Sequence, residues 1–279
     1  MSKVSKPIPA WGILSLATNG ILLVTVTILL SRQQANESPT APERTSVATV
    51  EPSPTPTPTP TPVPSPEPRV EELSPSTYQE RVERLREEVE AIAANAPERL
   101  YVLAGDSITL SFPEELLPLD VTWLNQGISG EGSQGLYERL PLLDGTRPDR
   151  IFIMIGINDL LRGEDDETIL ENHRRIIKDI LWIHPNTEVV VQSILPHSGE
   201  KATWEGREKL REVPNQRIER LNQRLAAIAQ VEGATYLNLY PLFVDETGYL
   251  NPALTTDGLH LNEQGYELWR IALILANTL

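Results

Sequence analysis

The stretch Leu100-Tyr101-Val102-Leu103-Ala104-Gly105-Asp106-Ser107 decides the fold of this chain. Its first five residues are apolar without a break, as expected for a buried strand of a parallel sheet. Gly105 and Asp106 are turn residues that would end the strand. Ser107 then follows the carboxyl end of the strand, where open α/β sheets bind their ligands. Because Gly, Asp and Ser also form ordinary turns, the meaning of this serine depends on the rest of the chain.

Further strands are expected along the chain, alternating with helices. The expected strands are 100–104, 120–124, 151–155, 188–194 and 235–239, and the expected helices are 133–143, 166–183, 214–231 and 262–277. Such alternation predicts an α/β fold, in which helices cover both faces of a parallel sheet. The apolar run 151–155 has the composition of a central strand that is buried on both faces.

The N-terminal part, residues 1–35, is expected to be a short tip followed by a membrane anchor. Residues 11–30 carry no charge, and as a helix they would span about 30 Å, the thickness of a hydrocarbon core. The run is longer than the apolar core of a cleaved signal peptide, and no small-residue cleavage site follows it. Lys3 and Lys6 precede it, which predicts that the rest of the chain is extracytoplasmic, in the periplasm or at the cell surface. Cleavage of this segment would instead give a secreted protein.

Residues 36–75 are expected to be a linker, because twelve of the 24 prolines lie between Pro39 and Pro75. Repeated Thr-Pro pairs exclude regular helix and sheet and favour an extended polyproline II spacer. An amphipathic helix is expected at 76–97, before a globular domain at 98–279. Its apolar residues are spaced by four and three and are expected to pack on that domain: Tyr78, Val82, Leu85, Val89 and Ile92.

Composition excludes several function classes. The formal net charge of −15 argues against binding to nucleic acid, which needs clustered Lys and Arg. The chain has no cysteine, which rules out a cysteine nucleophile and any cysteine-ligated metal site.

Four short blocks of polar residues follow the expected strands or precede the last helix. They are Gly105-Asp106-Ser107, Asn125-Gln126-Gly127-Ile128-Ser129-Gly130, Gly156-Ile157-Asn158-Asp159 and Asp257-Gly258-Leu259-His260. Together they contain the groups that ester hydrolysis requires. A serine hydroxyl needs a base, and histidine, which titrates near neutral pH, is suited to that role.

His260 is the expected base for Ser107, and Asp257 is close enough in sequence to orient its ring. The attacked carbonyl becomes an oxyanion that needs preorganised donors. The candidates are the backbone N–H groups of Ser107 and Gly130 and the side-chain amide of Asn158. His197 is the second candidate for the base, although no acid lies near it in sequence.

In their order, these four blocks resemble those of the GDSL, or SGNH, hydrolases over residues 98–279. The resemblance implies Ser107 as the nucleophile, Asp257 and His260 as the rest of a catalytic triad, and Ser107, Gly130 and Asn158 as the oxyanion hole. It also implies a flavodoxin-like three-layer α/β/α sandwich with a five-stranded, mainly parallel sheet. Ester substrates are implied, with neither a metal nor a cofactor. Two residues depart from the family pattern: Ile108 replaces leucine, and Leu261 replaces a frequent proline.

Several polar residues in or near the blocks have simpler structural interpretations. Asp106 is expected to brace its turn, Asn125 and Gly127 to shape a loop, and Asp159 to be a structural partner. His173 and His184 are expected at the surface. The acidic run 164–167 suits a solvated helix start, because carboxylates there are stabilised by the helix dipole.

The sequence therefore predicts an extracytoplasmic serine esterase that acts on short-chain or carbohydrate O-acetyl esters. Its partners would be an ester-bearing small molecule, lipid or glycan, and a membrane through the N-terminal helix, but no nucleic acid. Two alternatives remain open: an acyltransferase that acts on cell-envelope polymers, and a non-catalytic polysaccharide-binding surface module.

Overall fold

The computed structural model describes residues 75–276 of the 279-residue chain. In this part, five strands form one sheet in the order β2-β1-β3-β4-β5. All four pairs of neighbouring strands are parallel. The strands are β1 (Leu100–Gly105), β2 (Thr122–Gly127), β3 (Arg150–Met154), β4 (Glu188–Gln192) and β5 (Thr235–Leu237). The strand order reverses between β1 and β3, and the crevice outside their carboxyl ends is where such sheets bind ligands.

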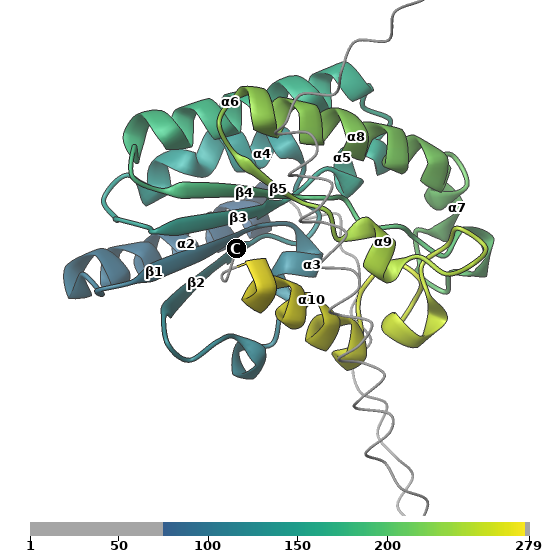
Figure 1. Ribbon diagram of the computed structural model, residues 1–279, viewed down its shortest axis with the longest axis horizontal. Coiled ribbons are helices and arrows are strands. Elements are labelled where there is room, and N and C mark those ends of the chain that lie inside the picture. Colours follow the sequence, from purple (N-terminus) through teal and green to yellow (C-terminus); the bar gives the residue numbers. More distant parts are fainter. Residues whose placement is uncertain (1–74, 277–279) are drawn as a thin grey trace, which may run out of the picture.

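Helices cover both faces of the sheet, so the predicted three-layer sandwich is confirmed (Figure 1). One face carries α2 (Pro75–Asn95), α4 (Ser133–Arg139), α6 (Asp166–Ile183) and α8 (Asn215–Val231), and the other carries α3 (Ser107–Leu110), α9 (Tyr240–Phe243) and α10 (Glu263–Ala276). The short helices α5 (Ile157–Leu161) and α7 (Arg207–Leu210) lie in connections, as do 3₁₀ turns at 114–116, 140–143, 199–201 and 252–254.

The alternation of side chains along the strands produces two apolar cores. Leu103 and Phe152 point to the side of α10, where Trp269 is completely buried. Val102 and Ile153, one residue further along each strand, point to the side of α6. Burial on both faces explains why these strands are apolar without interruption.

Three strands differ from the prediction by two or more residues at a boundary, and side chains explain two of these differences. Both β4 and β5 end two residues early. The side chain of Asn222 on α8 bonds both the N–H and the C=O of Ile194, at 2.9 and 2.8 Å, and so replaces sheet pairing after β4. The Ser193 hydroxyl accepts the N–H groups of Leu239 and Tyr240 at 2.9 and 2.8 Å, which ends β5.

The third difference is β2, which begins at Thr122 and continues to Gly127 instead of ending at 124. Asn125 and Gln126 remain paired with β1, although their polarity was read as a loop. The helix predicted at 133–143 ends at Arg139 and continues as a 3₁₀ turn that contains Pro141. Proline has no N–H for an α-helical bond, which accounts for the change.

Helix α2 begins before the first strand and packs on the sandwich, as its apolar spacing predicted. Leu85 and Val89 are 6% and 3% exposed, and Val89 belongs to the core on the α6 side of the sheet. No helix within residues 75–276 is long and apolar enough to cross a bilayer. The predicted anchor and most of the predicted linker lie outside the described residues.

Candidate active site

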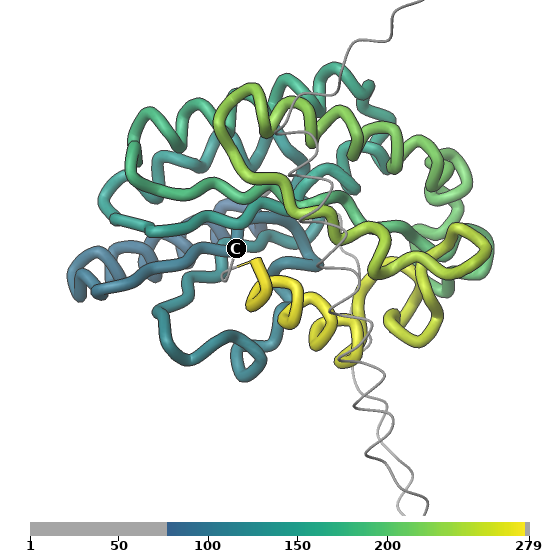
Figure 2. The backbone as a smooth tube through the Cα atoms, viewed as in Figure 1, coloured from purple at the N-terminus to yellow at the C-terminus, as the bar shows by residue number. Residues whose placement is uncertain are grey.

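Ser107 begins a short helix at the carboxyl end of β1. The Asp106 carboxylate accepts the N–H of Ile108 at 3.0 Å and caps this helix, as expected for a residue that braces the turn. The hydroxyl of Tyr266 on α10 donates to the C=O of Ile108 at 3.0 Å. Figure 2 shows α3 beside α10, two segments that lie far apart in the sequence. The last helix therefore supports the turn that presents the serine.

His260 and Asp257 reach Ser107 from a loop before α10. The distance between Ser107 Oγ and His260 Nε2 is 3.1 Å, and that between His260 Nδ1 and Asp257 Oδ2 is 2.7 Å. The second carboxylate oxygen accepts the backbone N–H groups of Leu259 and His260 at 2.9 and 2.8 Å. The structure thus brings together the three residues that the sequence proposed as a triad.

The hydrogen bonds define the tautomer of His260. Burial raises the pKa of Asp257, but hydrogen bonds from the His260 ring and backbone and attraction to the ring outweigh it, so the pKa lies below its usual value. The side chain is therefore an ionised, acceptor-only carboxylate at neutral pH, and Nδ1 must carry the proton. The lone pair of Nε2 is left to accept the hydroxyl proton of Ser107.

Gly130 and Asn158 follow β2 and β3, the two strands that flank β1 in the sheet. Gly130 has φ = +74°, and a Cβ at this position would meet no atom within 4 Å. Glycine is therefore favoured at this position by the left-handed backbone rather than by crowding. The Asn158 amide donates one N–H to the C=O of Glu131 at 3.0 Å, which leaves the second N–H for an oxyanion.

The loop that carries Gly130 is held from several sides. Asp159 accepts the backbone N–H of Ser133 with both carboxylate oxygens at 2.9 Å, and Asn172 donates to the Ser133 hydroxyl at 2.9 Å. The Arg162 guanidinium donates to the C=O of Gly130. Asp159 is thus a structural partner, as predicted. This bracing limits the movement of the proposed N–H donors, which is what transition-state stabilisation requires.

Glu131, directly after Gly130, forms a buried ion pair with Arg139. The two side chains are 1% and 5% exposed, and Arg139 Nη2 lies 2.7 Å from Glu131 Oε2. Arg139 Nη2 also donates to the C=O of Gln126 at 2.6 Å, which ties the ion pair to β2. No pattern in the sequence predicted this pair, because its members lie eight residues apart and only the loop conformation joins them.

Gly127 is required by a close approach between β2 and α3. A Cβ there would lie 2.3 Å from the backbone N and 2.6 Å from the Cα of Leu110. Asn125 accepts the N–H of Gly127 at 3.0 Å and donates to the C=O of Thr109 at 2.8 Å. Both residues therefore have structural roles, but they lie in strand β2 and at its contact with α3 rather than in the predicted loop.

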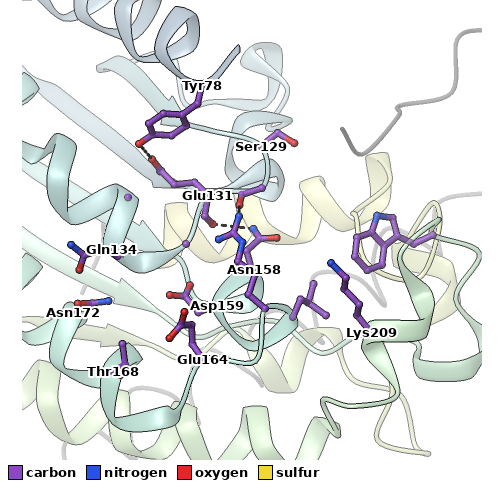
Figure 3. A pocket seen from close by; sticks show the side chains of 16 residues that line it. Tyr78, Ser129, Glu131, Gln134, Asn158, Asp159, Glu164, Thr168, Asn172 and Lys209 are labelled. Carbon is purple, nitrogen blue, oxygen red and sulfur yellow. Dashed lines mark hydrogen bonds between the residues drawn. The ribbon is translucent and has the colours of Figure 1, made fainter. Parts of the chain in front are cut away.

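A cleft of about 760 Å³ adjoins the proposed oxyanion hole (Figure 3). Gly130 and Asn158 form part of its wall. Its other polar lining residues include Gln134, Arg162, Glu164, Thr168, Asn172 and Lys209, with Trp204 as an apolar surface. The cleft combines polar side chains with apolar surface, so it can offer both hydrogen bonds and apolar contacts to a substrate.

The other histidines of the described region do not contact Ser107. His197 is 1% exposed, and its Nε2 and Nδ1 bond the C=O of Val213 and the N–H of Gly199 at 2.6 and 3.0 Å. Both nitrogens are occupied, so His197 is not available as the base. His173 was expected at the surface but is 1% exposed, because its Nδ1 bonds Ile169 inside α6 and the ring packs beneath that helix. Within residues 75–276, no group of three or more His, Asp or Glu side chains is arranged to hold a metal ion.

Comparison with known proteins places these features in one family. The sequence pattern of the GDSL-like lipase/acylhydrolase family matches residues 103–268. The structure is similar to that of a putative platelet activating factor from Streptococcus pneumonia, with a TM-score of 0.63 and 26% identity, covering 70% of this chain and 92% of the other. A GDSL-like lipase from Bacteroides thetaiotaomicron shares the fold, with a TM-score of 0.60 and 24% identity over 71% of this chain and 98% of the other.

One curated relative extends the comparison to sequence. An arylesterase from Vibrio mimicus is 33% identical over 124 residues, which is 39% of this chain. The aligned part spans 62% of the length of that arylesterase.

Proposed function

Because the chain belongs to the GDSL-like lipase/acylhydrolase family, we propose that it hydrolyses carboxylic esters with Ser107 as the nucleophile. His260 acts first as the base and then as the acid, and Asp257 orients its ring. The N–H groups of Ser107, Gly130 and Asn158 bind the oxyanion. The observation that carries this proposal is the unbroken series of short contacts from Ser107 Oγ through His260 to Asp257.

In the first step, Ser107 Oγ attacks the ester carbonyl while its proton passes to His260 Nε2. The carbonyl oxygen becomes negative and is stabilised by the three N–H donors. The protonated His260 then donates its proton to the departing alkoxide, which leaves as the alcohol. Water attacks the acyl-serine in the same way, with His260 again as the base, and releases the carboxylic acid.

The proposed substrates are short-chain acyl esters, among them the O-acetyl groups of carbohydrates. The polar side chains among the residues that line the cleft support this choice over a long lipid chain, because an alkyl chain that covered them would offer no hydrogen-bonding partners.

Turnover of two substrate series tests the proposal. We expect a fluorophosphonate probe to label Ser107, and we expect hydrolysis of acetylated oligosaccharides and of p-nitrophenyl acetate. Activity should fall as the acyl group of the p-nitrophenyl ester is lengthened. A folded protein that neither reacts with the probe nor cleaves any ester would contradict hydrolysis. Formation of a new ester with an added acceptor alcohol, in place of free acid, would identify an acyltransferase.

We further propose that residues 11–30 anchor the enzyme to a membrane with the catalytic domain outside the cytoplasm. The uncharged apolar run and the preceding lysines support this. Cell fractionation and protease treatment of intact cells test it. Membrane association and external cleavage are expected, whereas a protease-protected, freely soluble enzyme would contradict it.

A further inference from the structure

Glu131 connects the proposed oxyanion hole to the helix that precedes the catalytic sandwich. Its backbone carbonyl accepts the amide of Asn158 at 3.0 Å, and its N-terminal neighbour is Gly130. Its carboxylate, buried behind the hole, is bound from two sides. Movement of this one residue would therefore displace both proposed donors, Gly130 through the backbone and Asn158 through the hydrogen bond.

The first of the two sides is Arg139, whose guanidinium contacts both carboxylate oxygens of Glu131 at 2.7 to 3.0 Å. Arg139 also donates to the C=O of Gln126, so this contact joins Glu131 to the sheet. The charge of Glu131 is thus compensated within the sandwich itself.

The second side is Tyr78 on α2, whose hydroxyl donates to Glu131 Oε1 at 2.9 Å (Figure 3). Burial raises the pKa of Tyr78, and the negative charge of Glu131 raises it further, so the hydroxyl keeps its proton and stays a donor. Tyr78 lies outside the family match at residues 103–268. A side chain on α2 therefore contacts Glu131, the residue next to the proposed oxyanion donor Gly130.

We infer that Tyr78 is a positioning residue that holds the Gly130–Glu131 segment, and with it the oxyanion donors, in register with Ser107. The inference rests on the proposed esterase function. Arg139 on α4 alone can neutralise the carboxylate. The hydroxyl of Tyr78 is a second contact to the carboxylate, from α2, and restrains rotation of the loop about the Arg139 contact.

Removal of this hydroxyl should lower the rate of the chemical step without weakening substrate binding. A hydrogen bond to a charged group contributes modestly to stability, and small misplacement of catalytic groups costs large factors in rate. For Tyr78→Phe we therefore expect kcat to fall about 5- to 30-fold, with KM within about twofold of the wild-type value.

Tyr78 also lines the cleft, so the experiment must separate positioning from substrate contact. The full-length protein is assayed with p-nitrophenyl acetate, after titration of active sites with a fluorophosphonate. An alkylboronic acid, which forms a tetrahedral adduct with a nucleophilic serine, reports on the oxyanion hole. Acetate, the reaction product, reports on ground-state binding. We expect the inhibition constant of the boronic acid to rise by the same factor as kcat/KM falls, while that of acetate stays constant.

Tyr137→Phe is the matched control, because it removes the same atom from the neighbouring helix α4. The Tyr137 ring packs against the Arg175 guanidinium at 3.8 Å, outside the contacts of Glu131. Its kinetic constants should equal those of the wild type. Melting temperatures of both variants show whether a loss of rate follows from unfolding.

Three outcomes would overturn the inference. The first is an unchanged kcat in Tyr78→Phe, and the second is a rise in KM with unchanged affinity for the boronic acid, which would make Tyr78 only a wall of the cleft. The third is a loss of rate that disappears after normalisation to titrated active sites. A wild-type enzyme that neither cleaves esters nor reacts with the fluorophosphonate would overturn the proposed function itself, and this inference with it.

Discussion

Ser107 Oγ lies 3.1 Å from His260 Nε2, although 153 residues separate the two in sequence. The contact joins the end of the first strand to the loop before the last helix. The position of Ser107 also depends on α10, because the Tyr266 hydroxyl on that helix bonds the C=O of Ile108 in α3. If the contact between Ser107 and His260 transfers the proton in catalysis, either side chain alone is insufficient.

Ser107→Ala should lower kcat by at least about 10⁴-fold, because no other group can form the acyl intermediate. The measurement is turnover of p-nitrophenyl acetate, together with fluorophosphonate labelling. Ser129→Ala, at a serine that lines the cleft beside the proposed oxyanion hole, is the control and should keep both properties. Substantial labelling of Ser107→Ala would assign the nucleophile to a different residue.

Asn158→Ala should lower kcat by about 10²–10³-fold, because one of the oxyanion donors is lost. Steady-state kinetics with the same ester measure this effect, and KM should change little. The variant also leaves the C=O of Glu131 without the Asn158 amide, so the melting temperature is recorded alongside. A kcat within threefold of wild type would remove Asn158 from the oxyanion hole.

Asp106 should make the stability of the protein depend on pH. Burial raises its pKa to about 7, although the N–H of Ile108 and the nearby His260 oppose this, and Asp159 and Glu131 add to it. Between about pH 4 and 7 the folded protein then binds a proton that the unfolded protein has released. The stabilisation from this group is therefore complete below about pH 4 and is lost as the pH rises through 7.

Asp106→Asn cannot titrate but keeps an oxygen that can cap α3. Its free energy of unfolding should rise relative to the wild type between pH 4.5 and 8, by up to about 4 kcal/mol. Urea denaturation at several pH values measures the difference. A difference that is independent of pH would show that Asp106 does not titrate in this range.

Arg139→Met should destabilise the fold by about 3–5 kcal/mol, because it leaves the carboxylate of Glu131 buried without its counter-ion. Arg84→Met provides the contrast. Arg84 pairs with Glu88 on the surface of α2, where the two side chains are 80% and 41% exposed. Its loss should change the free energy of unfolding by less than about 0.5 kcal/mol. Equal effects of the two substitutions in urea denaturation would contradict this assignment.

Gly127→Ala should lower the free energy of unfolding by at least about 1–3 kcal/mol, because the new Cβ would overlap the backbone of Leu110. At Gly145 a Cβ would meet no atom within 4 Å, so Gly145→Ala should be close to neutral. Thermal melting of both variants tests the comparison. A small effect at Gly127 would mean that α3 can shift away from β2.

Much of the fold could be predicted from local patterns. Apolar runs marked the strands, and their alternation with amphipathic helices identified a parallel sheet. The helix at 166–183 was predicted with the boundaries that the structure has. In the structure, Asp165 caps it by accepting the N–H of Thr168 at 2.9 Å. The acidic residues there form a helix start, as their sequence indicated.

Elements that depend on contacts across the fold were harder to predict. The polar residues Asn125 and Gln126 lie in a strand because β1 pairs with them, and Ile194 leaves β4 because Asn222 binds its backbone. His173 is buried because it lies on the face of α6 that packs on the sheet. The charged residues beside it in the sequence had suggested an exposed position. In each case, a partner distant in sequence outweighed the local preference.

Some residues of the candidate site could be predicted from local motifs, and others depend on contacts between distant parts of the chain. The positions of Ser107, Asn158, Asp257 and His260 could be named because short motifs place them after strands or in one loop. The contacts of Tyr78 and Arg139 with Glu131 could not, because no motif links a helix at residue 78 to a loop at 131. Tyr78 was read only as one member of an apolar stripe, which explains its packing but not its hydroxyl.

The support that α10 gives to α3 also has a consequence for biosynthesis. A nascent polypeptide emerging from the ribosome carries Ser107 early, but it lacks both His260 and the Tyr266 hydroxyl that supports the serine turn. Until these residues have been translated, neither the proton acceptor nor the brace of the nucleophile exists. The order of synthesis therefore keeps the proposed enzyme inert until nearly all of its sandwich has been made.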